Sequence, residues 1–310
     1  MRPAYLDLHA SGELAERIAA ALDGLADCRL CPRACGVDRM RGETGFCGAG
    51  RQAVVAAFNP HFGEEAVLVG QNGSGTVFFA GCNLGCRFCQ NADISRDPRA
   101  GLPATPEELA GVMLDLQNRG CGNINFVTPS HVIPQILEAL PVGIEHGLNL
   151  PLVYNTGAYD SVDALRLLDG VVDIYMPDVK IWDPALAEKY LCAGNYPERA
   201  RRAVAEMHHQ VGDLVVENGA AVRGLLVRHL VMPGEVAGTG QWMEFLAGLS
   251  KNTCLNLMDQ YRPCAGADLL PPIDRMCTRE EFRTAEAEAE KHGLIRLDDR
   301  NDRFWARFLE

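Results

Sequence analysis

The 310-residue sequence lacks any apolar run near the roughly 18 residues that a membrane-spanning helix needs, which excludes a membrane span. It also lacks a basic excess, because 29 Lys and Arg stand against 41 Asp and Glu, a net charge of −12. This charge argues against binding to nucleic acid or an anionic membrane. The N-terminus carries Asp7 and Glu13 in an amphipathic pattern and does not resemble a signal peptide. We therefore expect a cytoplasmic protein.

Cysteine is the residue present in excess. Hydrophobic residues at 47% and charged residues at 23% are typical of a folded protein and exclude disorder. Against this ordinary background the chain has twelve cysteines, and seven of them fall in two tight groups. Thiols stay reduced in the cytosol, so clustered cysteines there indicate metal or redox chemistry rather than disulfides.

Three regions are predicted along the chain. Leu14, Ile18, Leu22 and Leu25 recur at helical spacing and predict a helix within residues 1–27. Residues 28–50 are rich in Cys, Gly and Arg without periodicity, which is typical of a segment held by a metal. We expect an N-terminal helix and Cys-rich segment over 1–70, a β/α region over 71–265 and a C-terminal helical extension over 266–310.

Strand-like and helix-like segments alternate after about residue 70. The predicted strands are Thr76–Ala80, Asn123–Val127, Pro151–Tyr154, Val172–Met176, Arg223–His229 and Thr253–Met258. Helices are predicted from Thr105, near His131–His146, Ser161–Leu168, Ala185–His209 and Gln241–Leu249, and from Thr278; the two threonines begin capping boxes with Glu108 and Glu281. Six β-α repeats predict an α/β fold with a parallel sheet. Six strands are too few for a closed eight-stranded barrel, which leaves a doubly wound sheet or a partial barrel.

The first cysteine group, Cys82, Cys86 and Cys89, follows the first predicted strand with C-x3-C-x2-C spacing. Gly81 and Gly85 let the loop curl, and three thiolates at this spacing suit a [4Fe–4S] cluster. Three cysteines leave one iron without a protein ligand, as a cluster needs in order to bind a substrate directly. The alternative is a zinc site that takes a remote fourth ligand.

With Phe88 as the aromatic residue, this C-x3-C-x-aromatic-C motif resembles the signature of radical S-adenosylmethionine (SAM) enzymes. The resemblance implies that the open iron binds the amino and carboxylate groups of SAM, and that one electron cleaves SAM to methionine and a 5′-deoxyadenosyl radical. It also implies a partial (β/α)6 barrel and a low-potential electron donor such as flavodoxin or ferredoxin. Over 28–260 the chain is most similar to pyruvate formate-lyase activating enzymes and their homologues with an N-terminal cysteine motif.

The resemblance also assigns SAM-binding residues at the strand ends, where barrel enzymes place their chemistry. The activating enzymes carry Gly-Gly-Glu after the second strand, whereas this chain has Thr128 and Ser130 and no carboxylate. Both hydroxyls are candidates for hydrogen bonds to SAM, and the alternative for Ser130 is a helix N-cap. After the third strand, Asn155 and Thr156 match Asp-Thr-Asn-Gly and would face SAM, while the family's Asp falls on Tyr154.

The later strands supply charged candidates. Asp178 and Lys180 match the family's Met-Leu-Asp-Leu-Lys and would bind the ribose and carboxylate of SAM; the alternative is a surface ion pair. Adjacent strand residues point to opposite faces, so only one of Arg228 and His229 can face the barrel interior. The resemblance favours Arg228 beside SAM, with His229 in the core.

The second cysteine group is the N-terminal quartet, defined as Cys28, Cys31, Cys35 and Cys47. Four cysteines complete a coordination sphere, so this set predicts a second metal site that holds either zinc or a fully ligated [4Fe–4S] cluster. Ligand softness does not choose between the two.

Three functions are compatible with these patterns. The first is a radical SAM enzyme similar to the activases that remove a hydrogen atom from a glycine of a protein substrate. The second is a radical SAM enzyme that modifies another peptide or a small molecule. The third is a non-catalytic iron–sulfur or zinc protein, which the open-site triad disfavours because a simple electron carrier ligates all its irons.

Overall fold

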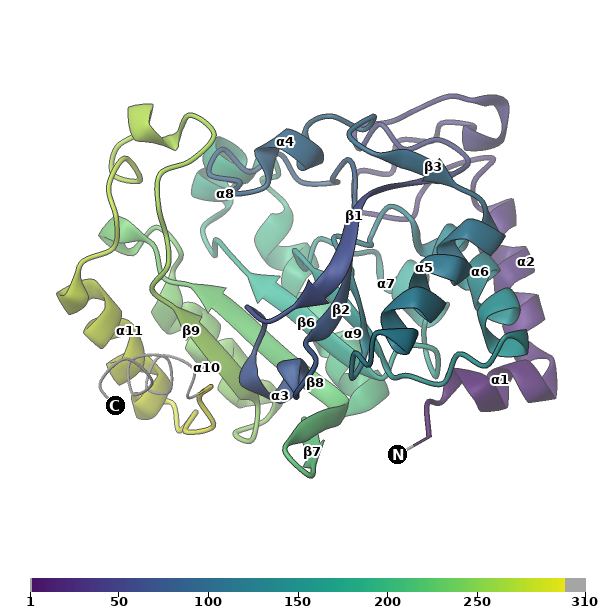
Figure 1. Cartoon of the computed structure of the whole chain (residues 1–310). Coiled ribbons are helices and arrows are strands. Elements are labelled where there is room, and N and C mark those ends of the chain that lie inside the picture. Colours follow the sequence, from purple (N-terminus) through teal and green to yellow (C-terminus); the bar gives the residue numbers. More distant parts are fainter. Residues whose placement is uncertain (1, 299–310) are drawn as a thin grey trace.

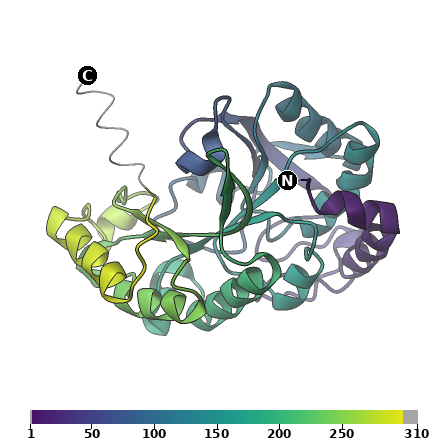
Figure 2. The same cartoon turned by 90° about the horizontal axis from the view of Figure 1, so that it is seen from below.

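The computed structural model describes residues 2–298 and shows a curved sheet with helices along its outer side (Figures 1 and 2). The strands are β1 (Ala53–His61), β2 (Ser74–Phe79), β3 (Leu102–Ala104), β4 (Ile124–Val127), β5 (Leu152–Thr156), β6 (Ile174–Val179), β7 (Val215–Glu217), β8 (Ala220–Leu230) and β9 (Cys254–Met258). The helices are α1 (Tyr5–Ser11), α2 (Glu13–Asp23), α3 (Ala66–Val69), α4 (Ala92–Ser95), α5 (Pro106–Asn118), α6 (Ile133–Glu145), α7 (Val162–Arg166), α8 (Pro184–Leu191), α9 (Tyr196–Val211), α10 (Thr239–Leu249) and α11 (Arg279–Lys291). Short 3-10 helices lie at Arg39–Arg41, Pro233–Glu235 and Ala267–Leu269.

The six predicted strands are confirmed as the parallel part of the sheet. They are β2, β4, β5, β6, β8 and β9, and each pairs in parallel with the next. Their spatial order follows the chain order, without the reversal that defines a doubly wound sheet. The arrangement is therefore that of a partial barrel. Three antiparallel strands that the sequence analysis missed, β1, β3 and β7, extend its edges.

Two predicted helices are each divided in the structure. The helix predicted within residues 1–27 is broken at Gly12, whose φ of 89° is left-handed and ends α1 before α2 begins. The helix predicted over 185–209 is broken at Cys192, which takes a left-handed φ of 56° between α8 and α9. Both predictions of one continuous helix were wrong. The capping boxes of Thr105 and Thr278 are confirmed at α5 and α11.

The interior of the partial barrel is apolar at one end and polar at the other. Leu68, from the short helix α3, packs in a buried cluster with Val153, Ile174, Met176 and Leu226. Because successive inward-facing residues are two apart, the next inward residues on β5, β6 and β8 are Asn155, Asp178 and Arg228. This alternation brings polar side chains from three strands together above the apolar layer.

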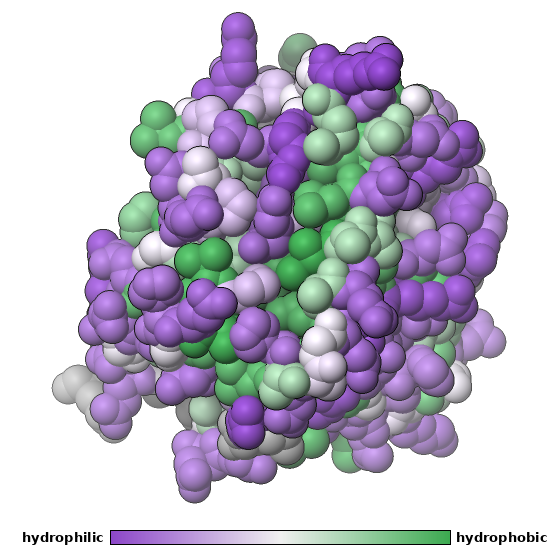
Figure 3. Space-filling model, turned by 90° about the vertical axis from the view of Figure 1, so that its right-hand side faces the viewer, coloured by the Kyte–Doolittle hydropathy of each residue, from purple (hydrophilic) through white to green (hydrophobic). Residues whose placement is uncertain are grey.

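The predicted division at residue 70 stays a prediction, although β1 lies on its N-terminal side and pairs with β2 on the other. Residues 299–310, assigned to the predicted C-terminal extension, lie outside the described residues. Within 2–298, no helix combines the length and apolar character that crossing a membrane requires. The face that carries α1 and α2 shows hydrophobic residues in a band between hydrophilic ones (Figure 3).

Candidate active site

The loop after β2 holds the cysteine triad in a fixed conformation. Backbone hydrogen bonds join Gly81 N to Ile94 O at 2.9 Å, Gly85 N to Leu191 O at 3.1 Å and Arg87 N to Tyr190 O at 2.8 Å. Gly81 has a φ of 79°, and a Cβ atom there would lie 2.4 Å from the Cys47 carbonyl oxygen. Only glycine fits this position, because any side chain would meet both backbone strain and a backbone atom.

The three thiols of the triad line one pocket at the carboxyl ends of the parallel strands. All three cysteines are free of disulfides. Burial raises the pKa of Cys82 to about 12, and burial likewise raises that of Cys86 to about 11, although the nearby Lys180 charge opposes it. Buried thiols of this kind become thiolates when a metal takes the place of the proton. The triad therefore fits the three-thiolate site of a [4Fe–4S] cluster.

A charged network from β6 and β8 lines the same pocket. Asp178 accepts a hydrogen bond from Arg228 Nε at 2.6 Å and another from Lys180 Nζ at 2.9 Å. Arg228 also donates to Asn155 Oδ1 at 2.7 Å. Burial raises the pKa of the Asp178 carboxyl, but the charges of Arg228 and Lys180 outweigh it and lower the pKa to about 2. The carboxylate is therefore ionised at neutral pH.

This network answers part of the sequence analysis. Asp178 and Lys180 do form an ion pair, but it lines the pocket rather than the open surface, with side chains 19% and 15% exposed. Their contact with SAM stays a prediction. Arg228 faces the interior as predicted. His229 is fully buried in the core, where Nδ1 lies 2.9 Å from Val179 O and Nε2 lies 2.9 Å from Thr239 Oγ1.

Two buried carboxylates that sequence reasoning missed also contact Arg228. Glu64 Oε2 and Glu65 Oε1, from the segment between β1 and α3, lie 3.5 Å and 3.8 Å from Arg228 Nη1. Glu65 Oε1 also accepts a hydrogen bond from Asn256 Nδ2 at 2.9 Å. Two adjacent acidic residues stand out in the sequence here, but the sequence does not indicate that their segment reaches across to β8.

The hydroxyl-bearing candidates separate into two groups. Thr128 and Thr156 line the pocket, whereas Ser130 is buried behind it and bonds to Thr156 Oγ1 at 3.0 Å. Thr156 Oγ1 in turn donates to Asp160 Oδ2 at 2.7 Å, and Tyr154 donates to Asp160 Oδ1 at 2.7 Å. The N-cap of α6 is Val132, so the alternative role of Ser130 as an N-cap was wrong.

Phe88, the aromatic residue of the motif, lines the pocket and is only 5% exposed. Its ring packs edge-on against Tyr261, with the ring centroids 5.9 Å apart. Phe88 thus joins the triad loop to the segment after β9.

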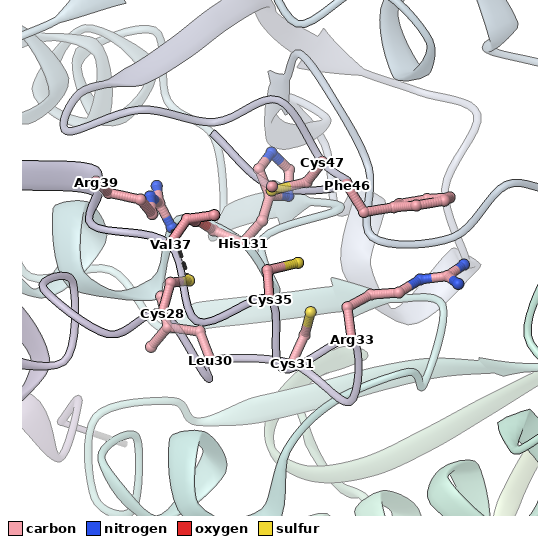
Figure 4. A pocket seen from close by; sticks show the side chains of 11 residues that line it. Cys28, Leu30, Cys31, Arg33, Cys35, Val37, Arg39, Phe46, Cys47 and His131 are labelled. Atoms are coloured by element: carbon pink, nitrogen blue, oxygen red, sulfur yellow. Dashed lines mark hydrogen bonds between the residues drawn. The ribbon is translucent and has the colours of Figure 1, made fainter. Parts of the chain in front are cut away.

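The N-terminal quartet lines a second pocket together with Arg39 and His131 (Figure 4). Burial raises the pKa of Cys31 to about 12. Within residues 2–298, no three His, Cys, Asp or Glu side chains converge on one position that could hold a single metal ion, and this applies to both thiol sets. Of the remaining cysteines, Cys121 and Cys254 are buried in the core, as predicted for Cys254.

Comparisons with known proteins give the family of this chain. The model of the radical SAM superfamily matches residues 76–239, which span the triad and the strands up to β8. An uncharacterized protein from Methanocaldococcus jannaschii is 32% identical over 308 residues, which cover 96% of this chain and 82% of the relative.

Two solved structures are similar at 8% sequence identity. TYW1 with a bound lysine–pyruvate adduct has a TM-score of 0.44, and the similarity covers 70% of this chain and 73% of the TYW1 chain. Streptococcus suis SuiB bound to the precursor peptide SuiA has a TM-score of 0.46, and the similarity covers 68% of this chain and 44% of the SuiB chain. Neither likeness bears on the substrate of this chain.

Proposed function

Because this chain belongs to the radical SAM superfamily, we propose that it is an iron–sulfur enzyme that abstracts a hydrogen atom, in the manner of the glycyl-radical-enzyme activases. Cys82, Cys86 and Cys89 would hold a [4Fe–4S] cluster, which would supply the one electron that cleaves SAM to methionine and a 5′-deoxyadenosyl radical. The observation that carries the proposal is the single pocket in which three cysteines meet Asn155, Asp178, Lys180 and Arg228. A carrier of electrons alone would need a fourth ligand, and among residues 2–298 the pocket lining holds three cysteines.

The chain's own residues would bind and orient SAM. Lys180 and Arg228 are cationic side chains that suit a carboxylate, and Asn155 and Thr156 suit hydroxyl groups. Asp178 fixes both cations in place, since each donates a hydrogen bond to it. Thr128 and the ring of Phe88 complete the wall. Ser130 would act indirectly, through its contact with Thr156.

The activase-like specificity is supported by the strand-end motifs around Asn155 and Asp178, which resemble those of pyruvate formate-lyase activating enzymes. We further propose a flavodoxin or ferredoxin as electron donor, a protein substrate, and a cytoplasmic location that suits two reduced thiol sets. The N-terminal quartet is proposed as a second metal site, with zinc or an iron–sulfur cluster as its occupant.

The specificity is tested with pyruvate formate-lyase as the probe substrate. The reconstituted and reduced protein is incubated with SAM and this probe, and a glycyl radical is sought by electron paramagnetic resonance (EPR). We expect the radical with the parent protein and none with the Cys86→Ala variant. SAM cleavage without a glycyl radical would contradict activase-like specificity toward this probe, and it would favour the alternative of another peptide or small-molecule substrate.

A further inference from the structure

Arg39 is a buried cation beside the N-terminal quartet. Its side chain is 1% exposed, and within residues 2–298 it takes part in no ion pair with a carboxylate. Its N–H groups donate to the carbonyl oxygens of Gly50 and His131, and Nη1 lies 3.9 Å from Cys28 Sγ (Figure 4). The carbonyls satisfy the donors but leave the charge without a counter-ion. A buried charge is stable only when it is paired, so the pocket is built for an anionic group.

His131 gives a second, independent sign of a bound group. It is 2% exposed and lines the same pocket. Its Nε2 lies 2.9 Å from the Ala80 carbonyl oxygen, so Nε2 carries the proton and Nδ1 keeps a lone pair. Nδ1 is buried without a hydrogen-bond partner in the described part of the chain. A buried acceptor without a partner in the lining of this pocket indicates that the pocket holds a further group, although the four cysteines supply all the ligands that the inferred cluster needs.

The arrangement of the thiols favours a cluster over a single ion. A zinc ion needs its four ligands to meet at one point, with Zn–S distances of about 2.3 Å. In residues 2–298 no three potential ligands converge in this way. This holds for the quartet and also for the triad, and the radical SAM superfamily binds a four-iron cluster at its triad. A four-iron cluster binds each thiolate to a different iron, so its ligands lie around a larger body.

We infer that Cys28, Cys31, Cys35 and Cys47 bind a second [4Fe–4S] cluster rather than zinc, and that Arg39 is the counter-charge of that anionic cluster. The inference deepens the proposed second metal site and rests on it. Four thiolates leave either metal centre with a net negative charge, which Arg39 offsets. Gly45 lines the same pocket, and a Cβ atom there would lie 2.6 Å from Cys35 Sγ, so a side chain at this position would displace that thiol.

The quartet is packed directly against the loop that carries the triad. The Cys47 carbonyl oxygen lies so close to Gly81, the residue before Cys82, that a Cβ atom there would be 2.4 Å away. Arg33 lies between two quartet cysteines and donates from Nε to Asn83 O at 2.9 Å. The ring of His131 bonds to Ala80 O on the same loop. Two clusters held by these segments would therefore be near neighbours.

The occupant is tested in a variant that lacks the first site, Cys82→Ala/Cys86→Ala/Cys89→Ala. The protein is reconstituted without oxygen in the presence of iron, sulfide and equimolar zinc, and its metals are counted. We expect about four irons and four sulfides per chain, and their loss when Cys28→Ala/Cys31→Ala is added. One zinc per chain without iron would overturn the inference while leaving the metal site in place. The absence of both metals would overturn the site as well.

Two further measurements test the surroundings of the cluster. In the triad-free protein, Arg39→Gln should lower the midpoint potential of the quartet cluster, because removal of a nearby positive charge makes reduction harder. Arg39→Lys keeps the charge and should retain the potential, so equal potentials in the two variants would refute the counter-charge role.

The distance between the two clusters is tested separately. In the fully reduced parent, the EPR signal should be broader than the sum of the signals of the two single-cluster variants. A signal equal to that sum would refute the close packing of the clusters. SAM cleavage enters none of these readouts, so they stand apart from the test of the proposed function.

Discussion

The replacement Asp178→Asn tests whether the charged network holds the site together. The carboxylate accepts hydrogen bonds from Arg228 and Lys180, and these partners lower its pKa from 3.8 to about 2. A tenfold change in acidity corresponds to about 1.4 kcal/mol, so at neutral pH the ionised form contributes roughly 2.5 kcal/mol to folding. Hydrogen bonds to a charged group give a similar figure, about 1.5–3 kcal/mol. The side chain is 19% exposed, so solvent screens this contribution only in part.

The two cations respond differently to this change. The amide keeps one acceptor oxygen where the carboxylate has two, so one of the two cations loses its hydrogen bond to this side chain. Arg228 keeps Glu64, Glu65 and Asn155 as further partners, whereas the Lys180 ammonium has no second hydrogen-bond acceptor within residues 2–298. We therefore expect Lys180 to become mobile and SAM affinity to fall about 10- to 150-fold, the equivalent of about 1.5–3 kcal/mol.

Urea unfolding at pH 7 and SAM binding to the reconstituted protein measure the two effects. The folded-state pKa is depressed, so the stabilisation is complete above the unfolded pKa near 3.8 and is lost as the pH falls through about 2. Asp163→Asn is the matched control, because that carboxylate is 91% exposed and pairs with Arg166 at the surface. A surface pair contributes about 0–1 kcal/mol. Equal stability losses in the two variants would refute the role of the network, and unchanged SAM affinity would refute its role in binding.

Three further predictions follow from other parts of the structure. Gly81→Ala should destabilise the protein more than Gly12→Ala in thermal unfolding. Both glycines have a positive φ, but only at Gly81 would the new Cβ atom clash with a backbone oxygen, that of Cys47. Equal losses of stability would show that this clash is unimportant. Leu68→Ala should cost about 2–5 kcal/mol in urea unfolding, because it opens a cavity inside the barrel, and a loss below about 1 kcal/mol would show that α3 is not part of the core. Cys86→Ala should abolish SAM cleavage, and production of 5′-deoxyadenosine at the parent rate would contradict the assignment of the triad.

The parallel core of the fold could be predicted from the sequence because its signals are local. Each of the six strands is a short apolar run, and the loop with Cys82 follows the first of them. Alternation along β8 indicated that only one of Arg228 and His229 faces the interior, and the family resemblance selected Arg228. Of the antiparallel strands that were missed, β1 begins with an apolar run, Ala53–Phe58, to which the sequence analysis gave no strand. β3 has three residues, two of them exposed, and is too short to leave a pattern.

The sequence predicted only those residues of the site that lie at the ends of strands. Glu64 and Glu65 reach Arg228 because the chain turns back between β1 and β2, and this path leaves no local signal. Ser130 follows a strand as the pattern requires, yet its side chain turns to Thr156 and the buried Asp160. Each divided helix is interrupted by a residue with a left-handed φ. At Cys192 this residue is not a glycine, so the sequence did not indicate the interruption.

The most direct test of the proposed activity is the anaerobic reaction of the iron- and sulfide-reconstituted protein with SAM and dithionite, followed by quantification of 5′-deoxyadenosine. We predict that the parent protein forms 5′-deoxyadenosine together with methionine, and that the triad-free variant, with its N-terminal quartet intact, forms neither. A parent protein that holds a full complement of iron and sulfide but leaves SAM uncleaved would contradict the assignment of this pocket as a radical SAM active site.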